Sequence, residues 1–515
     1  MKSLIKYFSP IIRGFLRLIL SRTSKRFEQA LTRPLESQEK TLKKILTLYN
    51  SSSYGIEKGK ASDYQEFIQN APLINYESIE EKIESMRVSK ENYFSPGPVI
   101  FYEPTSGSSG NKKLIPYTWA LKSSFSKMFS LWARDLLVNG PKFKYGKLYF
   151  SVSPQFKDDN EGLEDDAEYL EGFFSWFLKS FFTTPKKIKR LKDPHGFKKV
   201  LALHLLAQKN LEIISVWNPS TFAVLLEFID SNRKELLIDL EKGFIRQEGI
   251  TFKFAKPSPK RVAIIKEKPF SEIWPKLKLV SSWGSKEAEL GFNKLKKIFP
   301  NAFIQAKGLL ATEAPITIPL IKAKGFVPLI DSIFYEFENK NGEILRLHEI
   351  VGGEVYKLII STPGGLYRYS IGDRVSVPRF YKETPCLEFE GRGPETSDLF
   401  GEKINLSFLN NIVKNLKSDQ YYLFIPNRID ENHGYYTLLT NNEDKSLSSA
   451  VEKELMKGFH YKVARNLGTL KPLEVICKKD MNERVLNYLQ SEKGMKLGDI
   501  KPSLLLKEFD LKYLN

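Results

Sequence analysis

A short run of serine and glycine residues follows an apolar segment, and this feature most constrains the fold and function that the chain can have. Residues Val99–Tyr102 are β-branched or aromatic, a pattern that predicts a buried strand. Thr105 then begins the run T-S-G-S-S-G-N-K-K. Two glycines permit unusual backbone angles, and successive N–H groups in such a turn form a concave site that suits a phosphate. The run therefore indicates a phosphate-binding loop, although an ordinary surface hairpin would use the same turn residues.

The spacing of this loop excludes two common phosphate-binding motifs. It has no G-x-x-x-x-G-K-[ST] pattern, and no G-x-G-x-x-G opens a helix there. The run resembles the phosphate loop [ST]-S-G-[ST]-[ST]-G-x-P-K of the adenylate-forming superfamily. Lys113 falls on the lysine of that pattern and Lys112 replaces its proline. The resemblance implies that ATP phosphates are bound by Thr105, Ser106, Gly107, Ser108, Ser109, Gly110 and Lys113.

The next residues narrow the resemblance to one branch. Leu114–Pro116, L-I-P, resembles the Gretchen-Hagen auxin-responsive family of acyl acid amido synthetases. That family implies a large adenylation domain, in which parallel sheets are flanked by helices and joined by a β-barrel-like part. It also implies a small, mobile C-terminal lid domain of the α+β type.

Length and charge set outer bounds on the function. A chain of 515 residues is too long for one ordinary core, so we expect at least two domains. The net charge of +18 raises the possibility of nucleic-acid binding, but the lysines are scattered and no nucleic-acid motif accompanies them. We therefore expect a solvated, lysine-rich surface that attracts anionic ligands such as ATP. Cys386 and Cys477 are the only cysteines, which is typical of a reducing compartment, and we expect a cytoplasmic protein.

The N-terminal segment is basic and apolar at once. Arg13 and Arg17 interrupt what would be the apolar region of a signal peptide, and no A-x-A cleavage pattern follows. We expect an amphipathic helix packed on the body of the protein, with a membrane-surface helix as the alternative. No run of eighteen apolar residues occurs in the chain, so we expect no stable membrane insertion.

Alternation of strands and helices predicts an α/β fold with a largely parallel sheet. An aromatic stripe from Trp119 to Leu136 marks one helix face, which we interpret as core. The acidic run Asp158–Glu168 predicts a solvated loop, and residues 169–183 a helix. The predicted strands are Lys147–Val152, Leu211–Trp217, Leu277–Trp283 and Ala302–Ala306, with helices at 197–209, 219–241 and Lys286–Phe299. The turn Ser281–Ser285 follows the third strand, where open α/β sheets bind ligands.

A second motif follows the last of these strands. Gly308–Ala314 reads G-L-L-A-T-E-A. The hydroxyl of Thr312 can bond a phosphate oxygen and the carboxylate of Glu313 can hold Mg²⁺, although a helix-capping threonine beside an exposed glutamate has the same sequence. The superfamily has Y-G-x-T-E here, so the resemblance implies an ATP contact at Thr312 and a catalytic metal ligand at Glu313. Leu309 stands at the tyrosine position and offers no ring to adenine.

Three further segments occur in the family's order. Gly365–Val375 contains Y-R-Y-S-I-G-D, and an aspartate after glycine can bind a ribose diol or simply end a type I turn. By resemblance, Asp373 anchors the ribose and Arg392, in F-E-G-R-G, contacts ribose or phosphate. The later G-E-K-x-N segment places Lys403 where it reaches phosphate in one lid position, or lies on a solvated loop.

The remaining residues predict a compact lid. We expect residues 1–392 to form the large domain, 393–404 a hinge, and 405–515 the small domain. Strands are expected at Pro315–Leu320, Ile333–Glu338, Val355–Ser361, Val375–Tyr381, Tyr421–Pro426, Tyr435–Thr440 and Leu473–Lys478, and helices at Leu447–Phe459 and Asn482–Leu489. Lys501 is a candidate for the late lysine that assists adenylation elsewhere in the superfamily.

The resemblance implies a two-step ligase that forms a carbon–nitrogen bond. A carboxylate attacks ATP, in the presence of Mg²⁺, to give acyl-AMP and pyrophosphate, and an amine, usually an amino acid, then displaces AMP. We expect the partners to be a small carboxylic acid and an amine, and the protein to be a monomer. The alternatives are an acyl-CoA ligase that shares the first step, an enzyme that loads a separate carrier protein, and a non-catalytic basic protein that binds polyanions.

Overall fold

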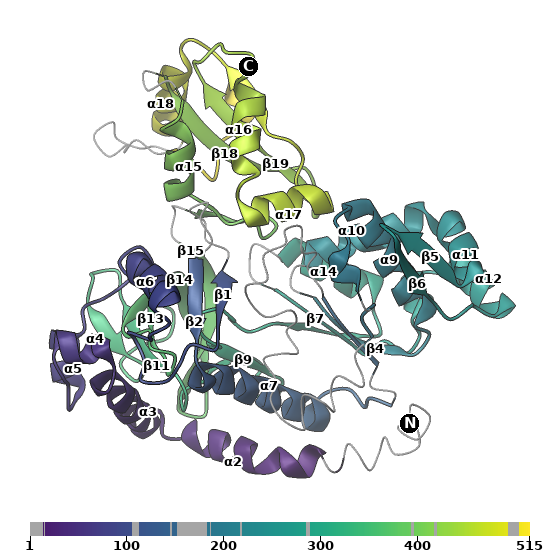
Figure 1. Cartoon of the computed structure of the whole chain (residues 1–515). Coiled ribbons are helices and arrows are strands. Elements are labelled where there is room, and N and C mark those ends of the chain that lie inside the picture. Colours follow the sequence, from purple (N-terminus) through teal and green to yellow (C-terminus); the bar gives the residue numbers. More distant parts are fainter. Residues whose placement is uncertain are drawn as a thin grey trace.

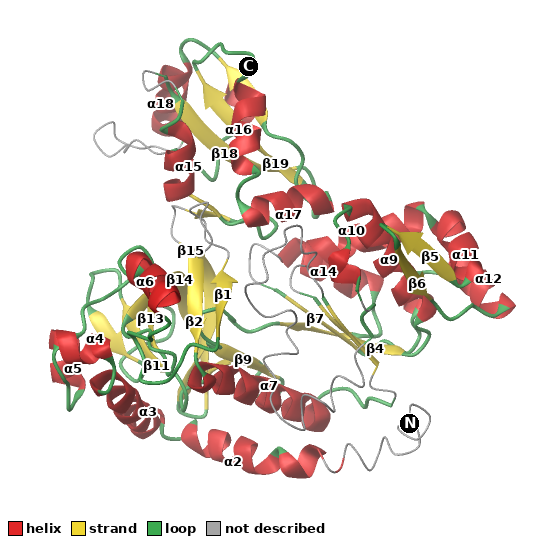
Figure 2. Cartoon of the chain, viewed as in Figure 1, coloured by secondary structure: helices red, strands yellow, loops and turns green. Residues whose placement is uncertain are grey.

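The computed structural model describes residues 14, 16–105, 113–144, 147–151, 183–185, 187–216, 219–284, 289–392, 396–416, 420–492 and 504–514. Helices and strands alternate along most of the chain, which confirms the predicted α/β class (Figure 2). Figure 1 shows the C-terminal part standing above the rest of the molecule. The predicted loop Asp158–Glu168, the helix at 169–183 and Lys501 lie outside the described residues.

From Ser21 onwards, helices lead into the first strands. They are α2 (Ser21–Ala30), α3 (Pro34–Asn50), α4 (Ser53–Lys58), α5 (Tyr64–Asn70) and α6 (Glu80–Ser89). Pro34 occupies the first turn of α3, where a missing N–H breaks no helical bond. Before α2, Leu16 and Leu20 are buried and Leu18 is exposed, so this segment packs on the body by one face. The Arg17 guanidinium also donates to Leu137 O at 2.9 Å.

A parallel sheet of four strands forms one half of the large N-terminal region. Its order is β3 (Lys147–Phe150), β4 (Leu211–Ser215), β7 (Leu279–Ser282) and β8 (Phe303–Ala306). The predicted helix at 219–241 is two helices, because the chain breaks at Asn232. The accompanying elements are η2 (Ile188–Arg190), α9 (Pro194–Ala207), α10 (Pro219–Ser231), α11 (Arg233–Lys242), the hairpin β5 (Phe244–Gln247) with β6 (Ile250–Lys253), α12 (Pro259–Glu267), α13 (Phe270–Ile273) and α14 (Glu289–Ile298).

The other half is built on antiparallel strands. The main sheet has the order β12 (Ile344–Arg346), β11 (Phe334–Glu338), β13 (Val355–Ser361), β14 (Tyr369–Tyr381) and β15 (Thr384–Arg392). Two hairpins accompany it, β1 (Phe101–Thr105) with β2 (Lys113–Tyr117) and β9 (Thr317–Leu320) with β10 (Gly325–Pro328). The strand predicted at Val375 begins six residues earlier, at Tyr369, because Tyr369 and Ser370 still pair with β13 beyond an irregularity between Lys357 and Ile359.

The helix α7 (Trp119–Asn139) carries the aromatic stripe. Phe125, Met128 and Leu136 are buried, which confirms most of the core interpretation. Trp119 is exposed, which departs from this interpretation, whereas Trp132 is half-buried and packs against the core. Thr118 caps the helix by accepting a hydrogen bond from Leu121 N.

The C-terminal part has its own hydrophobic cores. It contains the short pair β16 (Thr396–Ser397) with β17 (Ile404–Asn405), then α15 (Leu406–Val413), β18 (Tyr422–Arg428), β19 (Gly434–Thr440), α16 (Leu447–Leu455), α17 (Phe459–Leu467), β20 (Glu474–Cys477), α18 (Met481–Ser491) and η5 (Leu511–Leu514). The helix predicted at Leu447–Phe459 is confirmed as α16 from Leu447 to Leu455, but it ends four residues earlier than predicted, and a second helix follows after Gly458. No helix within the described ranges is long and apolar enough to cross a membrane.

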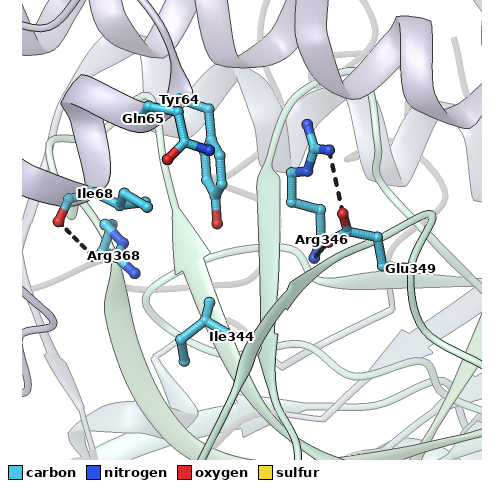
Figure 3. A pocket seen from close by; sticks show the side chains of 7 residues that line it. All are labelled: Tyr64, Gln65, Ile68, Ile344, Arg346, Glu349 and Arg368. Atoms are coloured by element: carbon cyan, nitrogen blue, oxygen red, sulfur yellow. Dashed lines mark hydrogen bonds and ion pairs between the residues drawn. The ribbon is translucent and has the colours of Figure 1, made fainter.

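A buried ion pair joins the N-terminal helices to the antiparallel sheet. The Nε of Arg368 lies 3.1 Å from both carboxylate oxygens of Glu336, and its Nη1 donates to the carbonyls of Ile68 and Ala71 at the end of α5. Tyr64 donates to the same carboxylate at 3.0 Å. Figure 3 shows the hollow of about 430 Å³ beside these residues. The charged side chains that line this hollow all have charged partners, because Arg346 bonds Glu349 and Arg368 bonds Glu336.

Removing Glu336 should therefore destabilise the protein strongly. Glu336→Ala leaves the buried guanidinium of Arg368 without its partner, and we expect a loss of about 3–5 kcal/mol in the free energy of unfolding. Glu338→Ala on the same strand removes a pair with Lys357, whose side chain is 57% exposed, and should cost at most about 1 kcal/mol. Denaturant unfolding followed by circular dichroism measures both. Equal, small losses would contradict the structural role of the buried pair.

Candidate functional site

The predicted phosphate loop connects two paired strands. Thr105 at the end of β1 is the direct partner of Lys113 at the start of β2, so the loop leaves and re-enters the hairpin at adjacent positions. The side chain of Thr105 and the whole of Ser106–Gly110 lie outside the described residues. The base of the hairpin is fixed, because Phe101 stacks on Tyr117 with ring centroids 4.7 Å apart.

Lys113 is held by an acidic partner beside the loop. Its Nζ lies 2.8 Å from Glu77 Oε1 and 5.1 Å from the centre of the Tyr76 ring. The Tyr76 hydroxyl accepts a hydrogen bond from Leu114 N at 2.8 Å, which fixes the ring under the strand. Burial opposes ionisation of Glu77, but the hydrogen bond and charge of Lys113 outweigh it and lower the pKa of Glu77. No sequence motif predicts this pair.

Thr312 and Glu313 form the tip of a tight turn. Leu310 and Pro315 pair as an antiparallel bridge, and the backbones of Ala311 and Ala314 exchange hydrogen bonds of 3.1 and 3.2 Å. The next element is the strand β9, so the helix-capping alternative for this threonine is wrong. The turn therefore carries a hydroxyl residue, Thr312, and a carboxylate residue, Glu313, at consecutive positions.

A tyrosine docks this turn on the loop hairpin. The Tyr117 hydroxyl, from the end of β2, donates to Thr312 O at 2.6 Å. This contact brings the predicted Thr-Glu motif next to the strand that carries Lys113. Tyr117 was not predicted as a site residue, and its position directly after L-I-P is the only sequence signal for it.

The residues before the turn are packed tightly. Leu309 is buried, and its N–H donates to Thr317 Oγ1 at 2.7 Å. A Cβ at Gly308 would lie 2.5 Å from Thr317 O, so glycine is required there. Leu309 is thus a core residue, consistent with its departure from the family's tyrosine.

Asp373 and Arg392 are brought together across two strands. They are direct partners in the β14–β15 ladder, although they are nineteen positions apart in the chain. Asp373 is 2% exposed and lies within β14 after Gly372, whose φ of +81° suits glycine. The alternative that this aspartate ends a type I turn is wrong, because the strand continues through it. The Arg392 side chain lies outside the described part.

The turn after β7 lies between the two sheets. The ring of Trp283 meets Phe389 of β15 edge-on, with centroids 5.5 Å apart. A Cβ at Gly284 would lie 2.6 Å from the Cβ of Ala306, so this turn also packs on β8. The described part of Ser281–Ser285 therefore links the carboxyl edge of the parallel sheet to the strand that carries Arg392, while Ser285 itself is not described.

The segment around Lys403 is folded about a buried glutamate. Gly401 and Lys403 have φ of +98° and +48°, which turns the chain sharply between β16 and β17. The Glu402 carboxylate accepts hydrogen bonds from Leu399 N, Phe400 N and the Tyr436 hydroxyl at 2.7, 2.8 and 2.5 Å. Burial raises the pKa of Glu402. Lys403 thus stands on a different element from the other predicted residues, and its distance from them depends on how this part is oriented.

The C-terminal part contacts the large region through the β18–β19 turn. Asn432 Nδ2 donates to Glu227 Oε1 of α10 at 2.8 Å, and Lys294 of α14 lies 2.8 Å from the same oxygen. Among the described residues, the Oδ1 of Asn432 is buried and accepts no hydrogen bond. This polar junction holds the C-terminal part in the orientation seen in Figure 1.

The donor set fits a metal that arrives with a nucleotide. No three His, Cys, Asp or Glu side chains gather as a metal site in the described ranges. Mg²⁺ commonly keeps several waters and uses one or two carboxylates together with substrate phosphates. One carboxylate residue, Glu313, next to Thr312 in the chain, is the kind of donor that such a site needs, whereas a closed protein cage would need several.

The comparisons place the chain among known proteins. Models of the GH3 family N-terminal domain and central domain match residues 23–304 and 326–392. Indole-3-acetic acid-amido synthetase GH3.15 of Arabidopsis thaliana is 22% identical, with 95% of this chain and 93% of the relative covered. Jasmonoyl-L-amino acid synthetase GH3.5 of Oryza sativa subsp. japonica is 24% identical over 71% of this chain and 72% of that protein.

A solved structure shares the fold. AtGH3.15 acyl acid amido synthetase in complex with 2,4-DB superposes with a TM-score of 0.65 at 18% identity, covering 96% of this chain and 95% of the other. The family models alone span more than half of the chain, in the order of the motifs found above, and confirm the predicted resemblance. The chain belongs to the GH3 family.

Proposed function

We propose that this protein is an ATP-dependent acyl acid amido synthetase. A carboxylate oxygen attacks the α-phosphorus of ATP, a bond to the β-phosphate oxygen breaks, and acyl-AMP and pyrophosphate result. The nitrogen of an amine, in our proposal an amino acid, then attacks the acyl carbon, loses a proton and expels AMP to leave an amide. The observation that carries this proposal is the Thr312–Glu313 turn, docked on the loop hairpin of a GH3 family chain.

The first step needs alignment and charge neutralisation more than covalent help. In this proposal the loop Thr105–Gly110 and Lys113 bind the phosphates, and the Thr312 hydroxyl bonds the α-phosphate. Asp373 and Arg392, paired across β14 and β15, hold the ribose and phosphate side of the nucleotide. Mg²⁺ held by Glu313 would neutralise charge on the phosphates.

The second step needs a different arrangement of residues around the acyl-AMP. We propose that movement of the lid domain produces this arrangement. We propose residues 1–392 as the large domain, 393–404 as the hinge and 405–515 as the lid. Rotation about the hinge would bring Lys403, or Lys501 in another position, toward the nucleotide. The positive φ angles at Gly401 and Lys403 and the small pair β16–β17 support a hinge here.

Product analysis tests the proposal. The protein is incubated with ATP, Mg²⁺, a panel of carboxylic acids, and either an amino-acid mixture or coenzyme A, and the products are identified by mass spectrometry. We expect an amide and AMP. A thioester in place of the amide would identify an acyl-CoA ligase, and binding of polyanions without any AMP would identify a non-catalytic protein.

We further propose a cytoplasmic monomer. Both cysteines are free, with Cys386 buried and Cys477 exposed, which suits a reducing compartment. Light scattering should give the mass of one chain, 59.3 kDa, and cell fractionation should place the protein in the soluble fraction. A dimer mass, or recovery with membranes, would contradict this part of the proposal.

Substitution of the two acidic residues should separate binding from turnover. Asp373→Asn removes a charged acceptor for the ribose and should raise the KM for ATP about 10- to 100-fold. Glu313→Gln should lower magnesium-dependent kcat by about 100-fold or more, with a smaller effect on the KM for ATP. Initial rates of AMP formation, at varied ATP and Mg²⁺, measure both. Near-wild-type activity in both variants would overturn the assignments, and Glu338→Gln serves as a control carboxylate.

Glu77 should compete with ATP for Lys113. If the phosphates bind Lys113, the ion pair with Glu77 must weaken first, so Glu77→Gln should lower the KM for ATP by up to about fivefold. Lys113→Met should raise the same KM. An increase in the KM for ATP in Glu77→Gln would show that Glu77 orients Lys113 for binding and does not compete.

The junction at Asn432 should affect the two half-reactions unequally. Asn432→Ala removes a hydrogen bond to a charged group, worth about 1.5–3 kcal/mol, and so depopulates the present lid orientation. We expect the ratio of amide formation to pyrophosphate exchange to change at least about threefold, with the KM for ATP unchanged. Asn410→Ala, on an exposed face of α15, is the control. An unchanged ratio would show that this orientation belongs to neither half-reaction.

A further inference from the structure

We infer that Lys307 binds the carboxylate of the acyl acid, and that the acid has an apolar, ring-containing body that lies against the aromatic side chains beside this lysine. The inference rests on the proposed function, because it names the substrate class of the same site. It is carried by one row of side chains near the carboxyl edge of the parallel sheet.

The ladder registers define this row. Phe150 pairs with Ser215, Ser215 with Ser281, and Ser281 with Gln305. Direct partners in a parallel ladder point to the same face of the sheet, so these four side chains line one face across β3, β4, β7 and β8. All four are buried. They occupy the last or next-to-last position of their strands, at the edge where open α/β sheets bind ligands.

An aromatic ring from α7 is fixed over this face. The indole N–H of Trp132 donates to Gln305 Oε1 at 2.9 Å, and Gln305 in turn donates to Pro319 O of β9 at 2.9 Å. This chain of hydrogen bonds holds the tryptophan ring in one orientation. Together with Phe150 from the row, it provides two aromatic surfaces from different elements.

Lys307 places a cation between these surfaces. It follows β8 directly, and its backbone N–H continues the ladder by donating to Ser282 O at 2.8 Å. Its Nζ donates to Ser215 Oγ at 2.7 Å and lies 5.9 Å from the ring centres of both Trp132 and Phe150. The lysine head is thus positioned by a hydroxyl and two rings at the carboxyl edge of the sheet.

The same face carries a second polar side chain, that of Ser281. Ser281 is fully buried, and its Oγ makes no hydrogen bond within the described residues. It stands in the row between Ser215, which bonds Lys307, and Gln305, which bonds Trp132. A buried hydroxyl without a partner is costly, and a ligand oxygen on this face would satisfy it.

The position of Lys307 also suits the chemistry of the first step. Thr312 lies five positions further along the chain, a span of at most about 18 Å, so both residues lie on the connection between β8 and β9. The Lys307 ammonium can hold one carboxylate oxygen while the other attacks the α-phosphorus. The same charge offsets the repulsion between the carboxylate and the triphosphate. Acids with a cationic body would meet a like charge here, so amino acids should be poor acyl donors.

Direct binding tests this assignment without turnover. Calorimetry measures the Kd of phenylacetate, indole-3-acetate and hexanoate in the presence of the α,β-methylene analogue of ATP. Lys307→Met keeps the length of the side chain and removes its charge, so we expect the Kd of the tightest acid to rise about tenfold or more. The Kd of phenylacetamide, which has no charge, should change less than about twofold, and Lys307→Arg should retain most of the acid binding.

Two further variants complete the design. Lys297→Met, an exposed lysine on α14, is the matched control and should bind the acids as the wild type does. Trp132→Leu should reduce the preference for phenylacetate over hexanoate about two- to tenfold, because one stacking surface is lost. An equal loss of phenylacetate and phenylacetamide binding in Lys307→Met would overturn the carboxylate assignment. A raised KM for ATP with an unchanged Kd for the acid would instead assign Lys307 to the nucleotide.

The outcomes separate this inference from the proposed function. Acid binding that depends on Lys307, without any pyrophosphate exchange, would contradict the proposed function and leave the carboxylate site standing. Exchange that is unaffected by Lys307→Met would contradict the inference alone. Absence of binding by all three acids in the wild type would overturn the proposed substrate class.

Discussion

The parallel register of β3, β4, β7 and β8 is the constraint on which the candidate site depends. It brings the carboxyl ends of four strands to one edge, and the chain leaves this edge through the turn at Trp283 and the connection after Ala306. Trp283 reaches the antiparallel sheet at Phe389, and the connection after Ala306 reaches the loop hairpin through Tyr117 and Thr312. Two sheets with different cores are therefore joined at the place where the predicted motifs meet.

The connection between β8 and β9 contributes to the candidate site at both of its ends. Its beginning, Lys307, faces the row of side chains on the parallel sheet, and its end, the Thr312–Glu313 turn, rests on the hairpin of the phosphate loop. The tight packing of Gly308 and Leu309 between them makes this connection rigid. A carboxylate held at one end and a phosphate at the other would be aligned by the backbone itself, which is the main requirement of adenylation.

Much of the fold and part of the site were predictable from the sequence. Apolar periodicity placed the parallel strands and most helices, and motif order picked out Lys113, Thr312, Asp373 and Arg392, which lie on the loop hairpin, the turn before β9 and the β14–β15 pair. The sequence did not predict the partners Glu77, Tyr117 and Glu402, because each acts across at least two elements and has no local pattern. The chain break at Gly458 was missed for a different reason, since the apolar pattern of α16 runs on into α17.

Carboxylate-dependent exchange of pyrophosphate into ATP tests the central claim most directly. It reports reversible formation of acyl-AMP and needs no knowledge of the amine. We expect exchange that requires Mg²⁺ and is supported by at least one acid with an apolar ring. Measurable ATP binding without exchange, across a broad panel of aromatic and aliphatic acids, would contradict the claim that this chain adenylates a carboxylic acid.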